Sequence, residues 1–340
     1  MNRHRTVRPA DARAHLDQLT KPPGSLGRLE DLAAQIAVLQ DTLKPAIQAP
    51  VALVFAADHG VADIGVSAFP KAVTAQMVLN FLAGGAAISV LARANDFALR
   101  IVDAGVDADF AAHPLLIDAK LGRGTRNYVD GPAMTGGEYA TALERAAQIV
   151  ADCADAGCNT LLLGEMGIGN TASSALLMHG LTGIDLATCV GRGTGLDDAG
   201  LARKAEILRR ALARRPLPAT AAELLTEYGG YEIAMLTGAI LAGARAGLLV
   251  LVDGFTVTAA AAAALAIEPA IADALVYTHC SAERGHAALL AHLGARPVLD
   301  LGMRLGEGSG AAVALPLVRA AVALFAGMAT FQSAGVSGKS

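Results

Sequence analysis

Tryptophan is absent from the 340-residue sequence, aromatic residues make up only 4% of it, and the basic residues form no cluster. Charged residues are also sparse, at 17%, and the formal net charge is −4. Proteins that bind nucleic acids need a basic surface and aromatic side chains on which bases can stack. We therefore expect no nucleic-acid partner and infer that the protein acts on small molecules.

The sequence also lacks an uninterrupted apolar run of the length that crosses a membrane, although 54% of its residues are hydrophobic and its mean hydropathy is +0.45. A transmembrane helix needs about 20 consecutive apolar residues. The best candidates, residues 233–252 and 311–330, are interrupted by Arg245 and by Pro316 and Arg319, respectively. The N-terminus has no apolar segment of the kind found in secretory signals. These absences predict a cytoplasmic protein without a membrane span.

Cysteine is scarce, and its spacing is not that of a zinc site. The four cysteines are Cys153, Cys158, Cys189 and Cys280. In a long chain without a secretory signal, such cysteines are expected to be reduced and buried. No Asp and His cluster at metal-ligand spacing is apparent either. We therefore expect neither a metal nor another cofactor.

From residue 51 onward, the sequence is dominated by short apolar runs that alternate with helical segments. Six runs predict strands, and each ends at a Gly, Asp or other polar residue: 51–56, 98–102, 160–163, 186–190, 248–252 and 274–277. Helices are predicted at 73–94, 137–156, 197–214, 231–246 and 255–267. This alternation predicts an α/β fold, with a Rossmann-like parallel sheet covered by helices on both faces. Ligands bind such sheets outside the carboxyl ends of the strands, where most polar residues of chemical interest fall.

The two ends of the chain differ from this central region. Apolar residues recur at three- and four-residue steps over 11–45, which predicts helices interrupted by a turn within 21–30. We divide the chain into a helical appendage (1–50), an α/β domain that carries the ligand site (51–310), and a C-terminal helix and tail (311–340). The segment 108–135, rich in Gly, Pro and charge, is interpreted as a mobile flap or an oligomer contact.

Two carboxylates lie among glycines, which leave space for a ligand to approach. Glu307 is the centre of GMRLGEGSG (302–310), and Glu165 follows the first glycine of GEMGIGNT (164–171). A glutamate that only faced solvent would not need such neighbours. We hypothesise that the two carboxylates share one site.

The loop 164–171 resembles two phosphate-binding motifs without satisfying either. It has the glycine spacing of a P-loop but no lysine, and Glu165 would place a negative charge beside the phosphates. Residues 167–172 also fit the dinucleotide fingerprint G-x-G-x-x-A, which normally opens the first strand–helix unit rather than about the third. A glycine loop at a helix N-terminus still suits one phosphate. The alternative is a tight turn that needs glycine for its geometry alone.

A second glycine loop, 191–198, has the same character. Its N–H groups are suited to a phosphate, and Lys204 lies within the helix that follows. The alternative is that Lys204 is an ordinary surface charge.

Three further motifs each allow two interpretations. Asp253 follows a hydrophobic strand and is suited either to ribose hydroxyls or to capping the helix that begins at Phe255. Asp58 and His59 form either an acid–base pair or local hydrogen bonds. The run 278–281 lacks the G-x-S-x-G elbow of hydrolases, so nucleophilic catalysis is not expected. Together the motifs indicate a nucleotide site with acid–base chemistry.

Seven blocks of sequence, spread in order over almost the whole chain, are specific when taken together. They are KPPGSLGRLE (21–30), ADHG (57–60), GVSAFP (65–70), GEMGIGNT (164–171), GRGTG (191–195), DGF (253–255) and RLGEGSG (304–310). They resemble the nicotinate-nucleotide–dimethylbenzimidazole phosphoribosyltransferase family. In that family a base such as 5,6-dimethylbenzimidazole displaces nicotinate from nicotinate mononucleotide, with inversion at the ribose anomeric carbon. The product, α-ribazole 5′-phosphate, supplies the lower ligand of cobamides.

The resemblance implies a six-stranded parallel sheet that binds nucleotide and base, a small helical domain built from both chain ends, and a homodimer. Glu307 matches the general base that takes the benzimidazole N–H proton, and Glu165 matches a second, supporting carboxylate. Ser309 stands where relatives often have threonine, which is a mild departure. The remaining matches are substrate-binding residues: Gly167, Ile168, Gly169 and Asn170 at the nucleotide; Gly191, Arg192, Gly193, Lys204 and Ser281 around the phosphate; Asp253 at the ribose; Phe69 and Gln76 at the benzimidazole; and Met166 and Leu305.

Two other functions stay open at this point. One is an NAD-dependent oxidoreductase that uses residues 167–172. The other is a protein that carries a nucleotide or base without turnover. Binding of NAD would indicate the first, and absence of nicotinate release would indicate the second.

Overall fold

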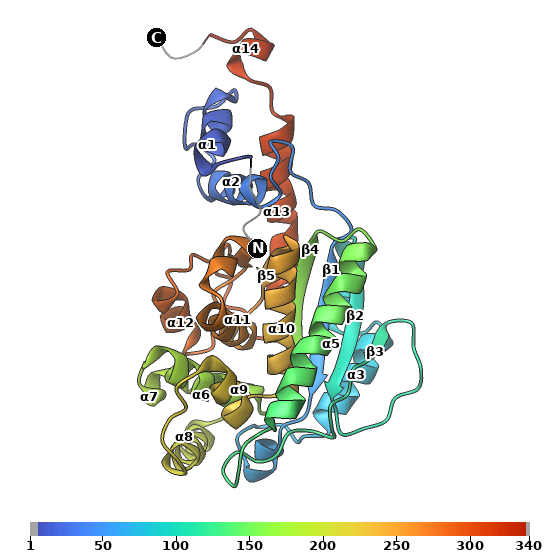
Figure 1. The fold of residues 1–340 in the computed structure, drawn as a ribbon, viewed down its shortest axis with the longest axis vertical. Coiled ribbons are helices and arrows are strands. Elements are labelled where there is room, and N and C mark those ends of the chain that lie inside the picture. The colour runs from blue at the N-terminus through green and yellow to red at the C-terminus, as the bar shows by residue number, and fades with distance from the viewer. Residues whose placement is uncertain (1–5, 338–340) are drawn as a thin grey trace.

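The computed structural model describes residues 6–337, and six parallel strands form one sheet at its centre (Figure 1). The strands are β1 (Val51–Ala57), β2 (Ala98–Gly105), β3 (Leu116–Asp118), β4 (Thr160–Met166), β5 (Leu249–Val252) and β6 (Leu275–Tyr277). Their order is β3-β2-β1-β4-β5-β6, so the chain builds outward from β1 in one direction and then from β4 in the other. The predicted α/β fold is confirmed. The reversal creates a switch point between β1 and β4, where open parallel sheets bind ligands.

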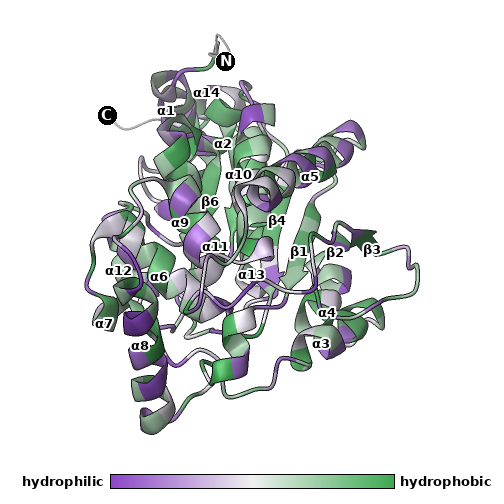
Figure 2. Cartoon of the chain, turned by 60° about the horizontal axis from the view of Figure 1, so that its bottom comes forward, coloured by the Kyte–Doolittle hydropathy of each residue, from purple (hydrophilic) through white to green (hydrophobic). Residues whose placement is uncertain are grey.

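The strands consist of continuous apolar residues because both faces of the sheet are covered. β5 is buried at every position, and β1 at every position after Val51. The hydropathy colouring of the central strands agrees with this (Figure 2). Phe55 of β1 pairs with Glu165 of β4, so the polar residues that follow the two strands emerge side by side.

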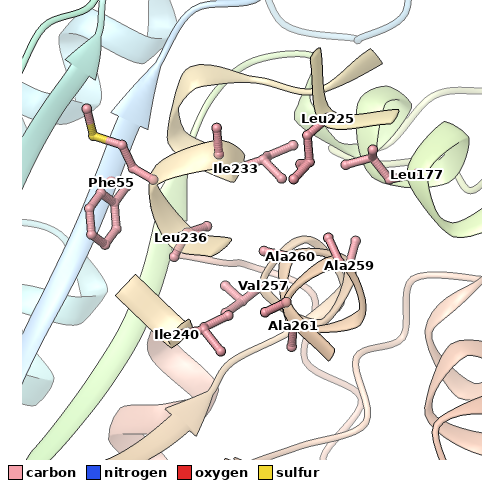
Figure 3. Packing of buried hydrophobic residues seen from close by; sticks show 14 of the residues in the cluster. Phe55, Leu177, Leu225, Ile233, Leu236, Ile240, Val257, Ala259, Ala260 and Ala261 are labelled. Atoms are coloured by element: carbon pink, nitrogen blue, oxygen red, sulfur yellow. The ribbon is translucent and has the colours of Figure 1, made fainter. Parts of the chain in front are cut away.

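Helices cover both faces of the sheet and form two hydrophobic cores. The first core involves α5 (Gly136–Asp155), α6 (Asn170–Thr182), α9 (Ala221–Tyr228), α10 (Tyr231–Ala246) and α11 (Phe255–Ile267). The alanine-rich α11 lies against α10, with Val257 and Ala261 near Ile240 (Figure 3). The second core involves α2 (Arg28–Leu39), α3 (Val73–Leu82), α4 (Ala87–Ala94) and α13 (Ser309–Gly327). Shorter elements border these layers: η1 (Gly60–Ile64), α7 (Leu186–Cys189), α8 (Asp198–Ala213), η2 (Pro269–Ala274) and α12 (His286–His292).

The two ends of the chain pack together beyond the sheet (Figure 1). α1 (Pro9–Gln18) and α2 lie beside the C-terminal part of α13, and α14 (Phe331–Ala334) follows. Leu19 forms an antiparallel bridge with Thr330, and His15 Nε2 lies 2.8 Å from the carbonyl oxygen of Phe325. α13 therefore connects this helical end to the carboxyl edge of the sheet, where it begins. The division into domains at residues 50 and 310 stays a prediction.

Three predicted elements differ from the structure. Residues 186–190 are not a strand: Leu186–Cys189 form α7, because the Asp185 side chain accepts a hydrogen bond from Ala187 N–H and caps a helical turn. The predicted helix 73–94 is two helices, α3 and α4, separated at Gly84 and Gly85. The segment 108–135 contains the edge strand β3, which was too short to predict. Short apolar runs do not distinguish strand from helix, which explains the first difference.

Among the residues that the structure describes, two stretches are long and apolar enough to cross a membrane by length and composition alone, Val73–Ala94 and Ser309–Gly327. The first is divided into α3 and α4. The second contains Pro316 and packs in the core through Leu315, Val318 and Phe325. These are features of core helices. The expectation that no segment spans a membrane stays a prediction.

Candidate active site

A hollow lies at each of the two edges of the sheet where strands begin or end. A groove of about 1220 Å³ lies where strands begin, since Gln48, Asn159 and Leu248 line it. A cavity of about 600 Å³ lies beyond the carboxyl ends and is lined by Gly191, Arg192, Gly193, Gly195, Leu196, Leu201, Ala282, Glu283, Arg284 and Arg304. The second one contains three arginines and the predicted phosphate loop. We place the candidate site at that carboxyl edge, as parallel sheets require.

The two predicted carboxylates lie on neighbouring backbone segments. The Glu307 N–H donates to the Glu165 carbonyl oxygen over 3.2 Å. A Cβ on Gly164 would lie 2.4 Å from the backbone nitrogen of Gly308, and one on Gly306 would lie 2.5 Å from Glu165 Oε1. The glycines around Glu165 and Glu307 therefore permit close packing of the two segments on each other. They were predicted instead to leave space for a ligand.

Glu307 has an unusual backbone and a buried side chain. Its φ is +63°, a left-handed conformation that side chains rarely adopt, and the residue is 5% exposed. Glu307 Oε2 accepts a hydrogen bond from Ile88 N–H, 3.2 Å away at the start of α4. Burial raises the pKa of Glu307 above its ordinary value, the Ile88 N–H opposes this, and the charge of Asp253 adds to it. A carboxylate with a raised pKa is a stronger base near neutral pH.

Glu165 lies at the end of β4 in a more strongly perturbed setting. Burial, followed by the charges of Asp253 and Glu232, raises the pKa of Glu165 to about 8, while the Asn170 amide opposes the rise by donating to Glu165 Oε2. Glu165 is therefore mainly a neutral carboxylic acid at pH 7. Such a group can donate a hydrogen bond, which an ionised carboxylate cannot.

The nucleotide loop, residues 167–170, leads into α6. Gly169 has a φ of +99° and precedes the first residue of the helix. Ile168 N–H donates to Thr74 Oγ1 at 3.1 Å, and Asn170 N–H donates to the carbonyl oxygen of Gly167 at 3.1 Å. These two N–H groups are engaged within the protein, so they are not free to bind a phosphate in this conformation.

Lys204 of α8 is fully buried rather than a surface charge. Its Nζ donates to Thr171 Oγ1 at 2.8 Å and to the Gly191 carbonyl at 3.1 Å. The ammonium thus joins the start of α6 to the second glycine loop. Burial lowers the pKa of Lys204 to about 8, and the Glu283 charge opposes this shift. The interpretation of Lys204 as an exposed lysine is wrong.

Glu283 and Ser281 lie against the second glycine loop. Glu283 Oε1 accepts a hydrogen bond from Gly193 N–H at 3.1 Å, and a Cβ on Gly191 would overlap that same oxygen. The Ser281 N–H donates to His286 Nδ1 at 2.7 Å. Sequence reasoning did not find Glu283, a carboxylate beside a predicted phosphate loop.

Asp253 does not cap the helix that begins at Phe255, because the N-cap of α11 is Gly254 and has no side-chain bond. Its carboxylate instead accepts hydrogen bonds from Gly308, Gly310 and Ala311 N–H at 3.2, 2.6 and 3.1 Å. Asp253 therefore caps α13 and fixes the turn that carries Glu307. That capping alternative is wrong, and contact with ribose stays a prediction.

The remaining predicted substrate-binding residues are largely exposed. Phe69 is 50% exposed, Leu305 is 58% exposed, and Gln76 is also exposed. Met166 is half-buried at the end of β4. Arg192 is exposed and donates to the carbonyl of Leu196 and to the carboxylate of Asp198. Contact of Phe69 and Gln76 with the base stays a prediction.

Asp58 and His59 make hydrogen bonds to residues far away in the sequence rather than local ones, and an acid–base role stays a prediction. Asp58 Oδ2 accepts from Asp107 N–H at 2.8 Å. His59 contacts Glu232 of α10, a carboxylate that sequence reasoning missed. Glu232 follows Gly229 and Gly230, so the signal that identified Glu165 and Glu307 was also present there.

Within residues 6–337, no group of three His, Cys, Asp or Glu side chains could hold a metal ion. The four cysteines are unpaired. Cys158 and Cys189 are buried, whereas Cys153 and Cys280 are partly exposed, which corrects the expectation that all four are buried.

Comparisons with known proteins cover nearly the whole chain. A family model described as "Phosphoribosyltransferase" matches residues 3–336. Two relatives are named nicotinate-nucleotide–dimethylbenzimidazole phosphoribosyltransferase. The one from Cupriavidus necator is 53% identical over 331 residues, covering 97% of this chain and 95% of the relative. The one from Ralstonia nicotianae is 55% identical over 330 residues, covering 96% and 93%.

A solved structure gives the same result. The crystal structure of the nicotinate-nucleotide–dimethylbenzimidazole phosphoribosyltransferase from Thermus thermophilus is 45% identical, with a TM-score of 0.92 and coverage of 97% of this chain and 98% of that one. Sequence, family model and structure agree along the full length of the fold. The chain belongs to the nicotinate-nucleotide–dimethylbenzimidazole phosphoribosyltransferase family.

Proposed function

We propose that this protein transfers the phosphoribosyl group of nicotinate mononucleotide to 5,6-dimethylbenzimidazole or a related base. The products are α-ribazole 5′-phosphate and nicotinate, and the reaction serves synthesis of the cobamide lower ligand. The observation that carries the proposal is the pairing of Glu165 and Glu307 at the sheet edge that also holds two glycine loops and a buried lysine. We also propose that the enzyme is a cytoplasmic homodimer.

The phosphate of the donor binds between the loops 167–170 and 191–193. Lys204 supplies the positive charge there, and the N-terminus of α6 adds its dipole. Gly193 N–H becomes available when Glu283 moves aside. The ribose then lies toward Glu165 and Glu307, while Phe69, Gln76, Met166 and Leu305 surround the base. This arrangement brings the two substrates together before any bond changes.

One nitrogen of the base attacks the ribose anomeric carbon from the face opposite nicotinate, which accounts for inversion. The C–N bond to nicotinate breaks, and its electron pair goes to the pyridinium nitrogen. The attacking ring loses its N–H proton to the carboxylate of Glu307. The ring of nicotinate is already positively charged while it is bonded to the ribose, so its departure needs no protonation.

Glu165 has a supporting role in this proposal. Because it is neutral at pH 7, it donates a hydrogen bond toward the bound substrates and does not add a second negative charge beside Glu307. The proton therefore has one acceptor, Glu307. Glu165 becomes a substitute base only when it ionises at higher pH.

The test is to mix the purified protein with nicotinate mononucleotide and 5,6-dimethylbenzimidazole and to measure nicotinate and α-ribazole 5′-phosphate by chromatography and mass spectrometry. We expect both products in equal amounts. Binding without release would support the non-catalytic carrier instead. Tight binding of NAD with hydride transfer would support the oxidoreductase, which the position of the glycine loop after β4 already disfavours.

A further inference from the structure

A buried polar cluster lies beneath the nucleotide loop, and the proposed mechanism does not use it. His59 and Glu232 are both fully buried, and His59 Nε2 lies 2.6 Å from Glu232 Oε1. The other ring nitrogen, Nδ1, lies 3.2 Å from the hydroxyl of Ser173. These residues come from the end of β1, the first turn of α10 and the first turn of α6. One imidazole therefore ties together three elements at the switch point of the sheet.

The nucleotide loop rests directly on this cluster. A Cβ on Gly167 would lie 3.1 Å from Glu232 Oε1 and 3.3 Å from His59 Nε2, and one on Gly169 would lie 3.5 Å from His59 Cβ. On the opposite side, a Cβ on Gly230 would lie 2.3 Å from His59 Cε1. Gly167 and Gly230 thus make room for the His59–Glu232 pair. The nucleotide loop therefore cannot move closer to this pair without displacing one of its side chains.

We propose that His59 and Glu232 are a positioning pair that fixes the nucleotide loop and thereby sets the affinity for the donor nucleotide. The pair holds the start of α6 through Ser173, and the same helix begins with Asn170, whose amide donates to Glu165. A change at His59 is therefore transmitted both to the phosphate-binding loop and to the second carboxylate of the site. The inference rests on the proposed function, because the ligand of the loop is the donor phosphate.

The charge of Glu232 also affects the ionisation of Glu165. Four elements present charged or polar groups to that carboxyl: Asp253 after β5, Glu232 on α10, Glu307 before α13 and Asn170 on α6. Only Asn170 favours the ionised form. Glu232 Oε2 has no hydrogen-bond partner among the described residues, and the charge of Glu232 helps to raise the pKa of Glu165. Removing that charge makes Glu165 easier to ionise.

Two variants separate geometry from charge. His59→Asn breaks the connection between α6 and α10, and we expect nicotinate mononucleotide to bind at least about tenfold more weakly by calorimetry, with KM affected more than kcat. Glu232→Gln still accepts the hydrogen bond of His59 but loses the charge. We expect a smaller loss of affinity at pH 6.5 than in His59→Asn. We also expect the pKa of Glu165, assigned as the titration that is absent in Glu165→Gln, to fall by about half a pH unit or more.

His15→Asn is the matched control, because His15 also makes a 2.8 Å hydrogen bond but lies among the terminal helices. It should lower thermal stability without changing nucleotide affinity. If His59→Asn does not fold, Ser173→Ala removes the Nδ1 partner of His59 and should weaken binding about threefold. Unchanged affinity in the folded His59 or Ser173 variant, or an unmoved titration in Glu232→Gln, overturns the inference. Wild-type protein that does not bind nicotinate mononucleotide at all would instead overturn the proposed function.

Discussion

The backbone N–H of Glu307 donates to the main-chain carbonyl of Glu165 across 3.2 Å, which joins the two site carboxylates through the backbone. The side chains of the two glutamates nevertheless have different surroundings. Glu307 accepts a hydrogen bond from the start of α4, whereas Glu165 faces three other carboxylates and one amide. Burial raises the pKa of both carboxyls, and at Glu165 the neighbouring charges and burial together raise it to about 8.

Glu307→Gln should lower kcat about 10²- to 10⁴-fold, which is the usual contribution of a general base. Glutamine still accepts the Ile88 hydrogen bond, so the fold should be retained. Nicotinate release measures the effect, and Glu144→Gln on the exposed part of α5 is the control for the substitution itself. Residual activity that rises above pH 8 and vanishes in the Glu165→Gln, Glu307→Gln double variant would show that Glu165 substitutes as the base. Near-wild-type kcat in the double variant would remove both carboxylates from proton transfer.

Glu165→Gln should stabilise the protein at high pH. The pKa of Glu165 is about 8 in the folded state, above its ordinary value of 4.5. Its stabilising effect is therefore fully present below pH 4.5 and is lost as the pH rises through 8. We expect the variant and the wild type to have similar Tm values at pH 5 and the variant to melt higher at pH 8.5. A difference in Tm that is constant across this range would contradict a raised pKa.

Gly306→Ala tests the packing of the Glu307 turn against Glu165. Gly306 has a φ of +84°, and its new Cβ would lie 2.5 Å from Glu165 Oε1. Gly302→Ala is the matched control, since Gly302 has a φ of +65° but nothing within 4 Å. Both should lose about 1 kcal/mol or more of stability from left-handed strain. Only Gly306→Ala should also lower kcat/KM, by about tenfold or more, because it displaces the carboxyl of Glu165. Equal kcat/KM in the two variants would contradict the described contact.

Affinity for nicotinate mononucleotide should fall above pH 8, by up to about tenfold per pH unit, because the pKa of Lys204 is about 8 and only the protonated amine attracts phosphate. Lys204→Met should bind more weakly at pH 7 and lose this dependence. Lys44→Met, at an exposed position by the opposite edge of the sheet, should behave as wild type. Calorimetric binding without base measures all three proteins. A wild-type affinity that stays constant from pH 7 to 9.5 would exclude Lys204 as the titrating phosphate partner.

Much of the molecule follows from local sequence patterns. Continuous apolar runs predicted five of the six strands, and Glu165 and Glu307 were found because glycines surround them. The prediction failed where local patterns are ambiguous. Residues 186–190 form a capped helical turn, and the three-residue β3 lies within a segment dominated by Gly, Pro and charge.

Periodicity in the sequence was enough to establish the α/β class, and residue type predicted a site at the carboxyl edge with two glutamates. The other features depend on tertiary contacts. Asp253 caps a helix that begins at Ser309, Lys204 is buried between two loops, and His59 pairs with Glu232. Each contact joins residues far apart in the chain, and it exists only after the sheet and helices have packed. The glycines around Glu307 were visible in the sequence, but the fold alone shows that they bring its backbone against Glu165.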